Sequence, residues 1–235
     1  MYDFETQGLD QAIKDLDALE REQLPFALAL TATWTAQDIQ AEEKKVIARV
    51  FDNPSPYVIN SVLVKSARKD NPIAAVWVSE GSVDKGGNIA KTLFAEIWGG
   101  KRKAKGFTHV MRNKGILKSN QYLSAAPNAK RNQYGNISKA SLKKVISDLE
   151  NPNSKKGRIK YFMLDDDSGA GSAWNNVIWK KLGRNDMEPF LIISDEAPSY
   201  KKRLPFYEVA ERILKKKIPV NFEKAMDYAI ASSIR

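Results

Sequence analysis

The alternation of apolar and polar positions predicts long helices near both ends of the chain. An amphipathic helix is expected first, with apolar residues at helical spacing at Leu9, Ile13, Leu16 and Leu19. Residues 26–50 contain no Gly or Pro and follow Pro25, whose fixed φ suits a first helical turn, so a second and longer helix is expected there. A C-terminal helix is expected over residues 205–234, and Pro219 should kink or restart it.

Segments rich in β-branched residues predict strands in two parts of the chain. Residues 61–68 and 73–80 have the composition of a hairpin, because the turn-forming residues 69–72 lie between them. Trp77, on the second of these strands, is expected to lie in the core. Three further strands are expected at residues 158–164, 175–181 and 188–194.

Short helices and loops are expected between the two groups of strands. Residues 89–98 carry apolar side chains at helical spacing and stop at Gly99, and another short helix is expected at 107–113. Ser138 can cap a third helix of this region. Residues 116–136 have no sustained period, which is typical of a long irregular loop.

Together these elements predict an α+β fold, in which an antiparallel sheet of about five strands is flanked by long N- and C-terminal helices. The chain is expected to form a single domain, residues 1–235, with a basic insertion of helices and loops between strands at residues 81–157. Hydrophobic residues make up 43% of the sequence and charged residues 28%, which is ordinary for a folded protein.

Several classes of protein are excluded by what the sequence lacks. It has no cysteine, which excludes disulfide frameworks and thiolate metal sites. Its longest apolar stretches are too short to span a bilayer, and the acidic N-terminal residues include no apolar leader. We therefore expect a protein that has no membrane partner and does not pass through the secretory route.

The net charge is concentrated in one quarter of the chain. Residues 101–160 contain 16 Lys or Arg and two acids, Asp148 and Glu150, which is a formal charge of +14. The other 175 residues contain 22 basic and 26 acidic residues, a formal charge of −4, and the total is +10. A basic segment rich in Gly, Asn and Ser is typical of a surface that faces a polyanion, although a solvated, flexible excursion has the same pattern.

The basic segment provides the candidate site residues. Their side chains could neutralise phosphates without reading bases, because few aromatic residues and no base-reading element lie among them. Any contact with nucleic acid would then be independent of base sequence and sensitive to salt. The residues expected to face DNA or a channel are Lys101, Arg102, Lys103, Lys105, Arg112, Lys114, Lys118, Lys130, Arg131, Lys155, Lys156 and Arg158.

An acidic motif and a glycine-rich motif are weaker candidates. Asp165, Asp166 and Asp167 follow a predicted strand, where nucleases place metal-binding carboxylates. Adjacent strand residues point to opposite faces, so the three cannot all bind one ion, and a solvated turn is the better interpretation. The sequence Gly169-Ala170-Gly171 lacks the spacing of a phosphate-binding loop.

The remaining polar residues indicate no catalytic centre. His109 is the only histidine, and no carboxylate that could orient it is near in sequence, so a structural or surface role is favoured. A zinc site is not expected from one histidine and no cysteine. The serines lack the context of an activated nucleophile. The sequence therefore predicts neither an enzyme nor a bound cofactor or metal.

Several short stretches occur in a recognisable order over most of the chain. They are Gly8-Leu9-Asp10-Gln11-Ala12 before Pro25 and a long helix, the break Asn53-Pro54-Ser55-Pro56-Tyr57, Trp98-Gly99-Gly100-Lys101-Arg102, Tyr134-Gly135-Asn136, and Pro198-Ser199-Tyr200-Lys201-Lys202-Arg203 before Phe206-Tyr207. This set resembles the tailed-bacteriophage minor tail proteins related to the tail-completion protein Z family. The shared motifs are structural, so the resemblance transfers no catalytic residue.

The resemblance implies a virion structural protein of the tail or neck that is assembled in the host cytoplasm. Such subunits form a homo-oligomeric ring around the DNA channel, either as a tail-completion or terminator protein or as a head-tail connector. The implied partners are copies of the chain and neighbouring tail tube or neck proteins, with non-specific contact to genomic DNA. The helices at 26–50 and 205–234 would then provide subunit contacts as well as core packing.

Two alternative functions stay open from the sequence alone. One is a sequence-independent DNA-binding protein that acts by itself in genome packaging or organisation. The other is a nuclease that uses the acidic cluster at Asp165. Salt-dependent binding of the monomer to duplex DNA would favour the first, and metal-dependent cleavage that is lost on Asp165→Ala would favour the second.

Overall fold

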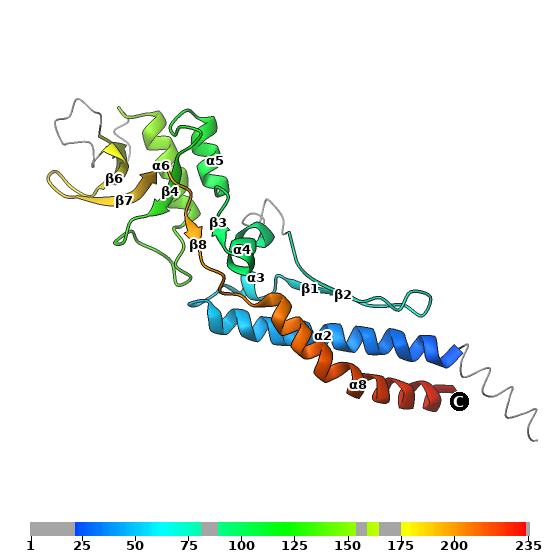
Figure 1. The fold of residues 1–235 in the computed structure, drawn as a ribbon. Coiled ribbons are helices and arrows are strands. Elements are labelled where there is room, and N and C mark those ends of the chain that lie inside the picture. Colours follow the sequence, from blue (N-terminus) through cyan, green and yellow to red (C-terminus); the bar gives the residue numbers. More distant parts are fainter. Residues whose placement is uncertain (1–21, 81–88, 154–158, 165–174, 234–235) are drawn as a thin grey trace, which may run out of the picture. The chain divides into compact units, whose positions relative to one another are not determined.

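The computed structural model describes residues 22–80, 89–153, 159–164 and 175–233, and Figure 1 shows its ribbon. The chain divides into two compact units. Residues 1–51, 56–79 and 204–235 belong to the first, here called the helical unit, and residues 52–55 and 80–203 belong to the second, the sheet unit. The α+β class and the two long terminal helices are confirmed. The helix expected at residues 9–19 lies outside the described residues.

Two antiparallel helices form most of the helical unit (Figure 1). The first, α2 (Leu24–Val50), has a proline in its first turn as predicted, and the second, α8 (Phe206–Ser233), returns beside it. Small residues allow the two helices to approach closely at one end, where Ala27 of α2 is buried against Ala225 and Ala229 of α8.

A buried amide holds the middle of the two helices in register. Asn221 Nδ2 donates to Thr35 Oγ1 at 3.1 Å and to Asp38 Oδ2 at 3.0 Å. Close by, α8 continues through Pro219, so the expected restart does not occur. Packing of the surrounding turns against α2 offsets the hydrogen bond that a proline cannot donate.

The predicted hairpin is confirmed and forms a separate two-stranded sheet. A short helix, α3 (Pro56–Ile59), leads into its strands β1 (Val62–Lys65) and β2 (Ala75–Val78). Trp77 pairs with Leu63 across the strands and is 41% exposed, so the prediction that it lies in the core is wrong. A hairpin of two strands buries one face only, and the alternation of side chains places this pair on the other face.

Four antiparallel strands form the main sheet of the sheet unit, in the order β4-β7-β6-β5. They are β4 (Tyr122–Ala125), β5 (Lys160–Met163), β6 (Val177–Lys181) and β7 (Met187–Ser194). The expectation of one sheet of about five strands differs from this arrangement, because the hairpin stands apart and β4 is an additional strand. β4 lies in the segment interpreted as an irregular loop; its four residues form a strand because they pair with the distant β7.

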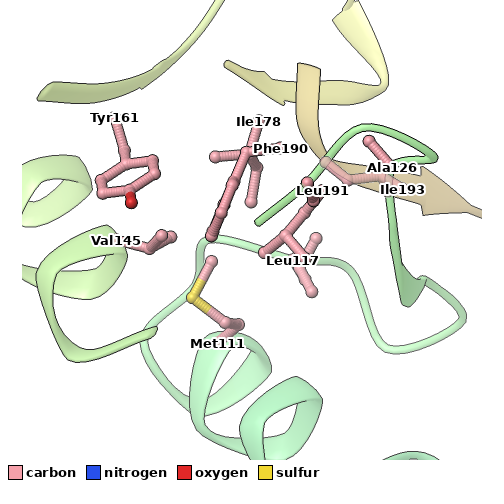
Figure 2. Close-up of a cluster of buried hydrophobic side chains, with 10 residues drawn as sticks. Met111, Leu117, Ala126, Val145, Tyr161, Ile178, Phe190, Leu191 and Ile193 are labelled. Atoms are coloured by element: carbon pink, nitrogen blue, oxygen red, sulfur yellow. The ribbon is translucent and has the colours of Figure 1, made fainter. Parts of the chain in front are cut away.

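Two helices pack on this sheet and enclose its hydrophobic core. They are α5 (Gly106–Asn113) and α6 (Lys139–Glu150), and Ser138 caps α6 as predicted, since its Oγ accepts a hydrogen bond from Ser141 N at 3.1 Å. Figure 2 shows the buried side chains that converge from the helices, strands and connecting loops: Met111, Leu117, Ala126, Val145, Tyr161, Ile178, Phe190, Leu191 and Ile193. This cluster packs α5 and α6 against the four-stranded sheet.

A buried carboxylate ties the edge strand β5 to α6. Asp148 Oδ2 accepts a hydrogen bond from Tyr161 N at 3.0 Å, and its Oδ1 lies 2.9 Å from Lys144 Nζ. An edge strand has backbone groups that no neighbouring strand satisfies, and this bond satisfies one of them.

Candidate functional site

The helix α4 (Ile89–Trp98) and a pair of two-residue strands form a small substructure of the sheet unit. The strands are β3 (Gly100–Lys101) and β8 (Ser199–Tyr200), which pair antiparallel. Gly99 ends α4 as predicted: it has a φ of +76°, which favours glycine, and its N–H donates to Ala95 O at 2.9 Å. This turn brings the basic residues after β3 next to the exposed side of α4.

An ion pair fixes α4 to the chain that follows β8. Arg203 Nε donates to Glu96 Oε2 at 2.8 Å and Arg203 Nη2 donates to Glu96 Oε1 at 2.9 Å, while Arg203 N also donates to the Glu96 carbonyl at 2.8 Å. The hydrogen bond to Glu96 raises the pKa of the Arg203 guanidinium above its ordinary value. Because the Glu96 carboxylate is buried and both its oxygens are used, α4 has one defined position in this substructure.

Replacing Glu96 with glutamine should lower the free energy of unfolding by about 1.5–3 kcal/mol, because a charged two-point hydrogen bond is lost while its partner stays half-buried. The matched control is Glu150→Gln, which breaks the exposed pair of Glu150 with Lys114 and should cost about 1 kcal/mol or less. Urea unfolding of both variants measures the difference. Equal losses would mean that the Glu96 pair is no stronger than a surface pair.

Two aromatic side chains on α4 lie on the surface. Phe94 is 61% exposed and Trp98 is 57% exposed, and their ring centroids are 6.3 Å apart. Their exposure was not predicted, although Ile89, Leu93 and Ile97 already account for the buried face of α4. Phe94 and Trp98 lie off this stripe, and that position in the sequence could have indicated that they are exposed.

A pocket of about 250 Å³ lies beside this aromatic pair, within the sheet unit. Its walls combine apolar side chains of α4 with the basic residue at the end of β3 and the two that follow it. The lining residues are Glu80, Ala90, Lys91, Phe94, Ala95, Lys101, Arg102 and Lys103. Three residues predicted to face DNA or a channel are therefore brought together at one pocket.

Five of the predicted basic residues are exposed and make no ion pair with another described residue. These are Lys101, Lys103, Lys105, Lys118 and Lys130. All belong to the sheet unit, and their ammonium groups are accessible to an anionic partner.

Four others have partners within the fold. Arg102 Nη1 donates to Tyr200 Oη at 3.1 Å, and Arg131 Nη2 donates to the Ala126 carbonyl at 3.1 Å. The guanidinium of Arg112 donates to the Gln121 carbonyl at 2.6 and 3.1 Å and lies 4.8 Å from the centroid of the Tyr122 ring. Lys114 pairs with Glu150. Lys155, Lys156 and Arg158 lie outside the described residues.

The outer side of α8 carries a row of apolar side chains. Leu214, Ile218 and Phe222 follow one another at intervals of four residues, and each is between 36 and 45% exposed. An exposed apolar row along one side of a helix is a candidate for contact with another protein.

A buried acid in the helical unit is a further feature that the sequence analysis missed. Glu43 lies on the buried stripe of α2, and neither of its carboxylate oxygens has a hydrogen-bond partner among the described residues. Burial raises the pKa of Glu43 to about 8, with smaller contributions from the charges of Glu42 and Glu208, while Arg212 acts in the opposite direction. The carboxyl group therefore holds its proton at neutral pH.

The structure adds no support for His109, the acidic motif or the glycine-rich motif as functional sites. His109 is exposed on α5, and the motifs at Asp165 and Gly169 lie outside the described residues. In the part of the chain that the structure describes, no three His, Asp or Glu side chains are grouped as a metal site. None of the helices there is long and apolar enough to cross a membrane.

Comparison with known proteins identifies the family. The chain matches the family described as prophage minor tail protein Z (GPZ) over residues 6–147, which is more than half of its length. Comparisons with curated proteins and with solved structures found no match. The family match confirms the resemblance seen in the sequence, and the family is one of structural tail proteins and not a known family of enzymes. The chain belongs to the prophage minor tail protein Z family and has a structural role in a phage tail.

Proposed function

We propose that this tail protein is the subunit of a homo-oligomeric ring that completes the tail or joins it to the head, with the DNA channel at the centre of the ring. The observation that carries the proposal is the exposed row Leu214, Ile218 and Phe222 on α8. A protein of a tail structure that exposes such a row has a surface suited to a neighbouring subunit.

The free energy gained by covering the α8 row is large enough to contribute to a contact between subunits. Complete burial of a Leu, Ile or Phe side chain contributes about 1.5–3 kcal/mol, and these side chains still expose about two fifths of their surface, so covering each contributes about 1 kcal/mol. A row of three, with the polar groups around it, supports association of subunits. If the contact joins different surfaces of successive copies, it generates a closed ring when the rotation between copies closes.

The exposed lysines of the sheet unit suit the surface that faces the channel. Their charges attract DNA as it passes, and contacts to phosphates alone give no sequence-dependent grip. Neighbouring tail tube or neck proteins would then cover the two faces of the ring. Assembly in the host cytoplasm follows from the same proposal.

Replacing Ile218 with aspartate should abolish ring formation, because a carboxylate would have to be desolvated in the contact. Size-exclusion chromatography with light scattering and negative-stain microscopy measure the assembly. The matched control is Val220→Asp: Val220 is equally exposed on α8, but it is two residues away and so lies on another side of the helix.

The expected result is rings from the wild-type chain and from the Val220→Asp variant, and smaller species from the Ile218→Asp variant. A wild-type chain that stays monomeric, alone and with other tail proteins, would overturn the ring. Rings from the Ile218→Asp variant would show that the α8 row is not the contact.

A further inference from the structure

We propose that the pocket beside α4 receives residues 1–21 of a neighbouring copy of the chain. The inference rests on the proposed ring and adds to it a specific contact: an acidic, amphipathic segment of one subunit docks on the aromatic and basic surface of the next. Three features carry it: the composition of the pocket, its rigidity, and the composition of the segment.

The pocket combines an apolar wall with a basic rim. Phe94 and Ala90 of α4 provide the apolar wall, and Lys101, Arg102 and Lys103 provide the positive charge. Among the described residues that line the pocket, Glu80 is the only acid. Such a surface fits a segment that carries apolar and acidic side chains together, because the apolar groups fill the pocket while the carboxylates meet the rim.

The pocket is held in shape before anything binds. The Glu96–Arg203 ion pair fixes α4, and the turn at Gly99 fixes the chain that carries the basic rim. The Arg102 guanidinium is directed by its hydrogen bond to Tyr200 Oη and lies 5.9 Å from the centroid of that ring. A preformed pocket loses little conformational entropy when a partner binds.

The sequence of residues 1–21 has the complementary composition. It contains six acids and two bases, a formal charge of −4, where the basic quarter of the chain has +14. Its apolar residues recur at helical spacing, and three of the six acids, Asp10, Asp15 and Asp17, lie between them. The apolar residues are Leu9, Ile13, Leu16 and Leu19. Docking of an amphipathic helix in a groove uses such a spacing.

A neighbouring copy is the occupant that suits a ring. When each copy has one segment to donate and one pocket to fill, the contact is between two different surfaces and can repeat until the ring closes. This arrangement uses Lys101 and Lys103 for the segment. It leaves Lys105, Lys118 and Lys130 as the exposed lysines for DNA.

Disulfide trapping tests the contact directly, because the chain contains no cysteine. Full-length Ala90→Cys, in the pocket, is mixed with full-length Gln11→Cys, in the segment, under ring-forming conditions and then oxidised. Since docking raises the effective concentration of the two thiols from micromolar towards millimolar, the cross-linked dimer of the two variants should form at least about tenfold faster than in a control mixture. The control replaces Ala90→Cys with Asn185→Cys, on the exposed turn between β6 and β7.

Charge exchange provides the second readout. Lys101→Glu with Lys103→Glu in the Ala90→Cys chain should remove the tenfold advantage, and Asp10→Lys with Asp17→Lys in the Gln11→Cys chain should restore at least part of it. Restoration cannot be explained by a pocket that has unfolded.

The outcomes separate this inference from the proposed ring. If rings form without preferential cross-linking, the docking proposal is wrong and the proposed ring stands. Cross-linking within a single chain that carries both cysteines, without any between chains, also overturns it, since the segment then folds back on its own subunit. Absence of rings from the wild-type chain overturns the proposed ring itself.

Discussion

Replacing Glu43 with leucine is expected to raise the free energy of unfolding of the helical unit by about 3 kcal/mol at pH 7 and by about 5 kcal/mol at pH 9. In the folded protein the buried carboxyl has a pKa of about 8, whereas in the unfolded chain it has the ordinary value of 4.5. Above pH 4.5 the Glu43 carboxylate must therefore either take up a proton or be buried as a charge when the chain folds. A leucine at this position has neither cost, and it leaves no polar atom without a partner.

The pH dependence has a defined direction. Because the folded pKa of Glu43 lies above its unfolded pKa, the contribution of this group to stability is fully present below pH 4.5, falls by about 1.4 kcal/mol per pH unit between pH 4.5 and pH 8, and levels off above pH 8. The gap between the leucine variant and the wild type should widen over the same window. Urea unfolding at several pH values measures the gap, and hydrogen exchange of the α2 amides assigns it to the helical unit.

Two further variants separate the causes. Glu43→Gln keeps the shape and a polar group but cannot titrate, so it should remove this pH dependence while gaining less stability than leucine. Glu211→Gln, on the exposed side of α8, should change the stability by no more than about 0.5 kcal/mol at any pH. A Glu43→Leu variant that is less stable than wild type at pH 9 would mean that the carboxylate has a partner.

Reversing the charge of Lys105, Lys118 and Lys130 together to glutamate should weaken binding of the assembled ring to duplex DNA by about 500-fold at 0.1 M salt for each subunit that contacts the DNA, if each of its three lysines neutralises one phosphate. The estimate follows from the release of about 0.9 counterions per contact, so three contacts contribute a salt slope of about 2.7. Two duplexes of unrelated sequence should give the same result, because these side chains read no bases. Fluorescence anisotropy across a range of salt concentrations measures both quantities.

The control exchanges the same number of charges elsewhere in the sheet unit. Lys139 and Lys143 of α6 and Lys181 of β6 are also exposed, and their reversal should have a much smaller effect on the slope. If both triple variants lose the same affinity, the contact depends on net charge alone and not on a surface that faces the channel. Tight, salt-dependent binding by the monomer would instead support a DNA-binding protein that acts without a ring.

Elements with strong local signals were predictable from the sequence. Pro25 in a first turn, Gly99 at a helix end and Ser138 as a cap act through bonds within a few residues, so α2, α4 and α6 were placed nearly to the residue. The hairpin was predictable for the same reason, since turn residues separate two β-branched segments.

Features that depend on distant partners were not predictable. β4 has only four residues, and its strand conformation depends on β7, which follows along the chain only after α6, β5 and β6. Glu43 stands among charged residues, and nothing nearby in sequence indicates that α8 covers it. The DNA-facing residues were predicted from charge alone, and the sequence could not show that Arg112 binds a backbone carbonyl while Lys105 stays exposed.

The pairing of α2 with α8 determines the order in which the chain can fold during synthesis. Nearly all of the sheet unit is one continuous stretch, residues 80–203, so it can fold as soon as that stretch has left the ribosome. α2 is synthesised long before α8, so its inner face has no packing partner until α8 is complete. The contact between the two helices is long-range, and contacts of this kind slow folding. Until α8 is complete, the apolar stripe of α2 is available to chaperones and to other nascent chains. The slowest step in producing assembly-competent subunits should therefore be the closure of this helix pair.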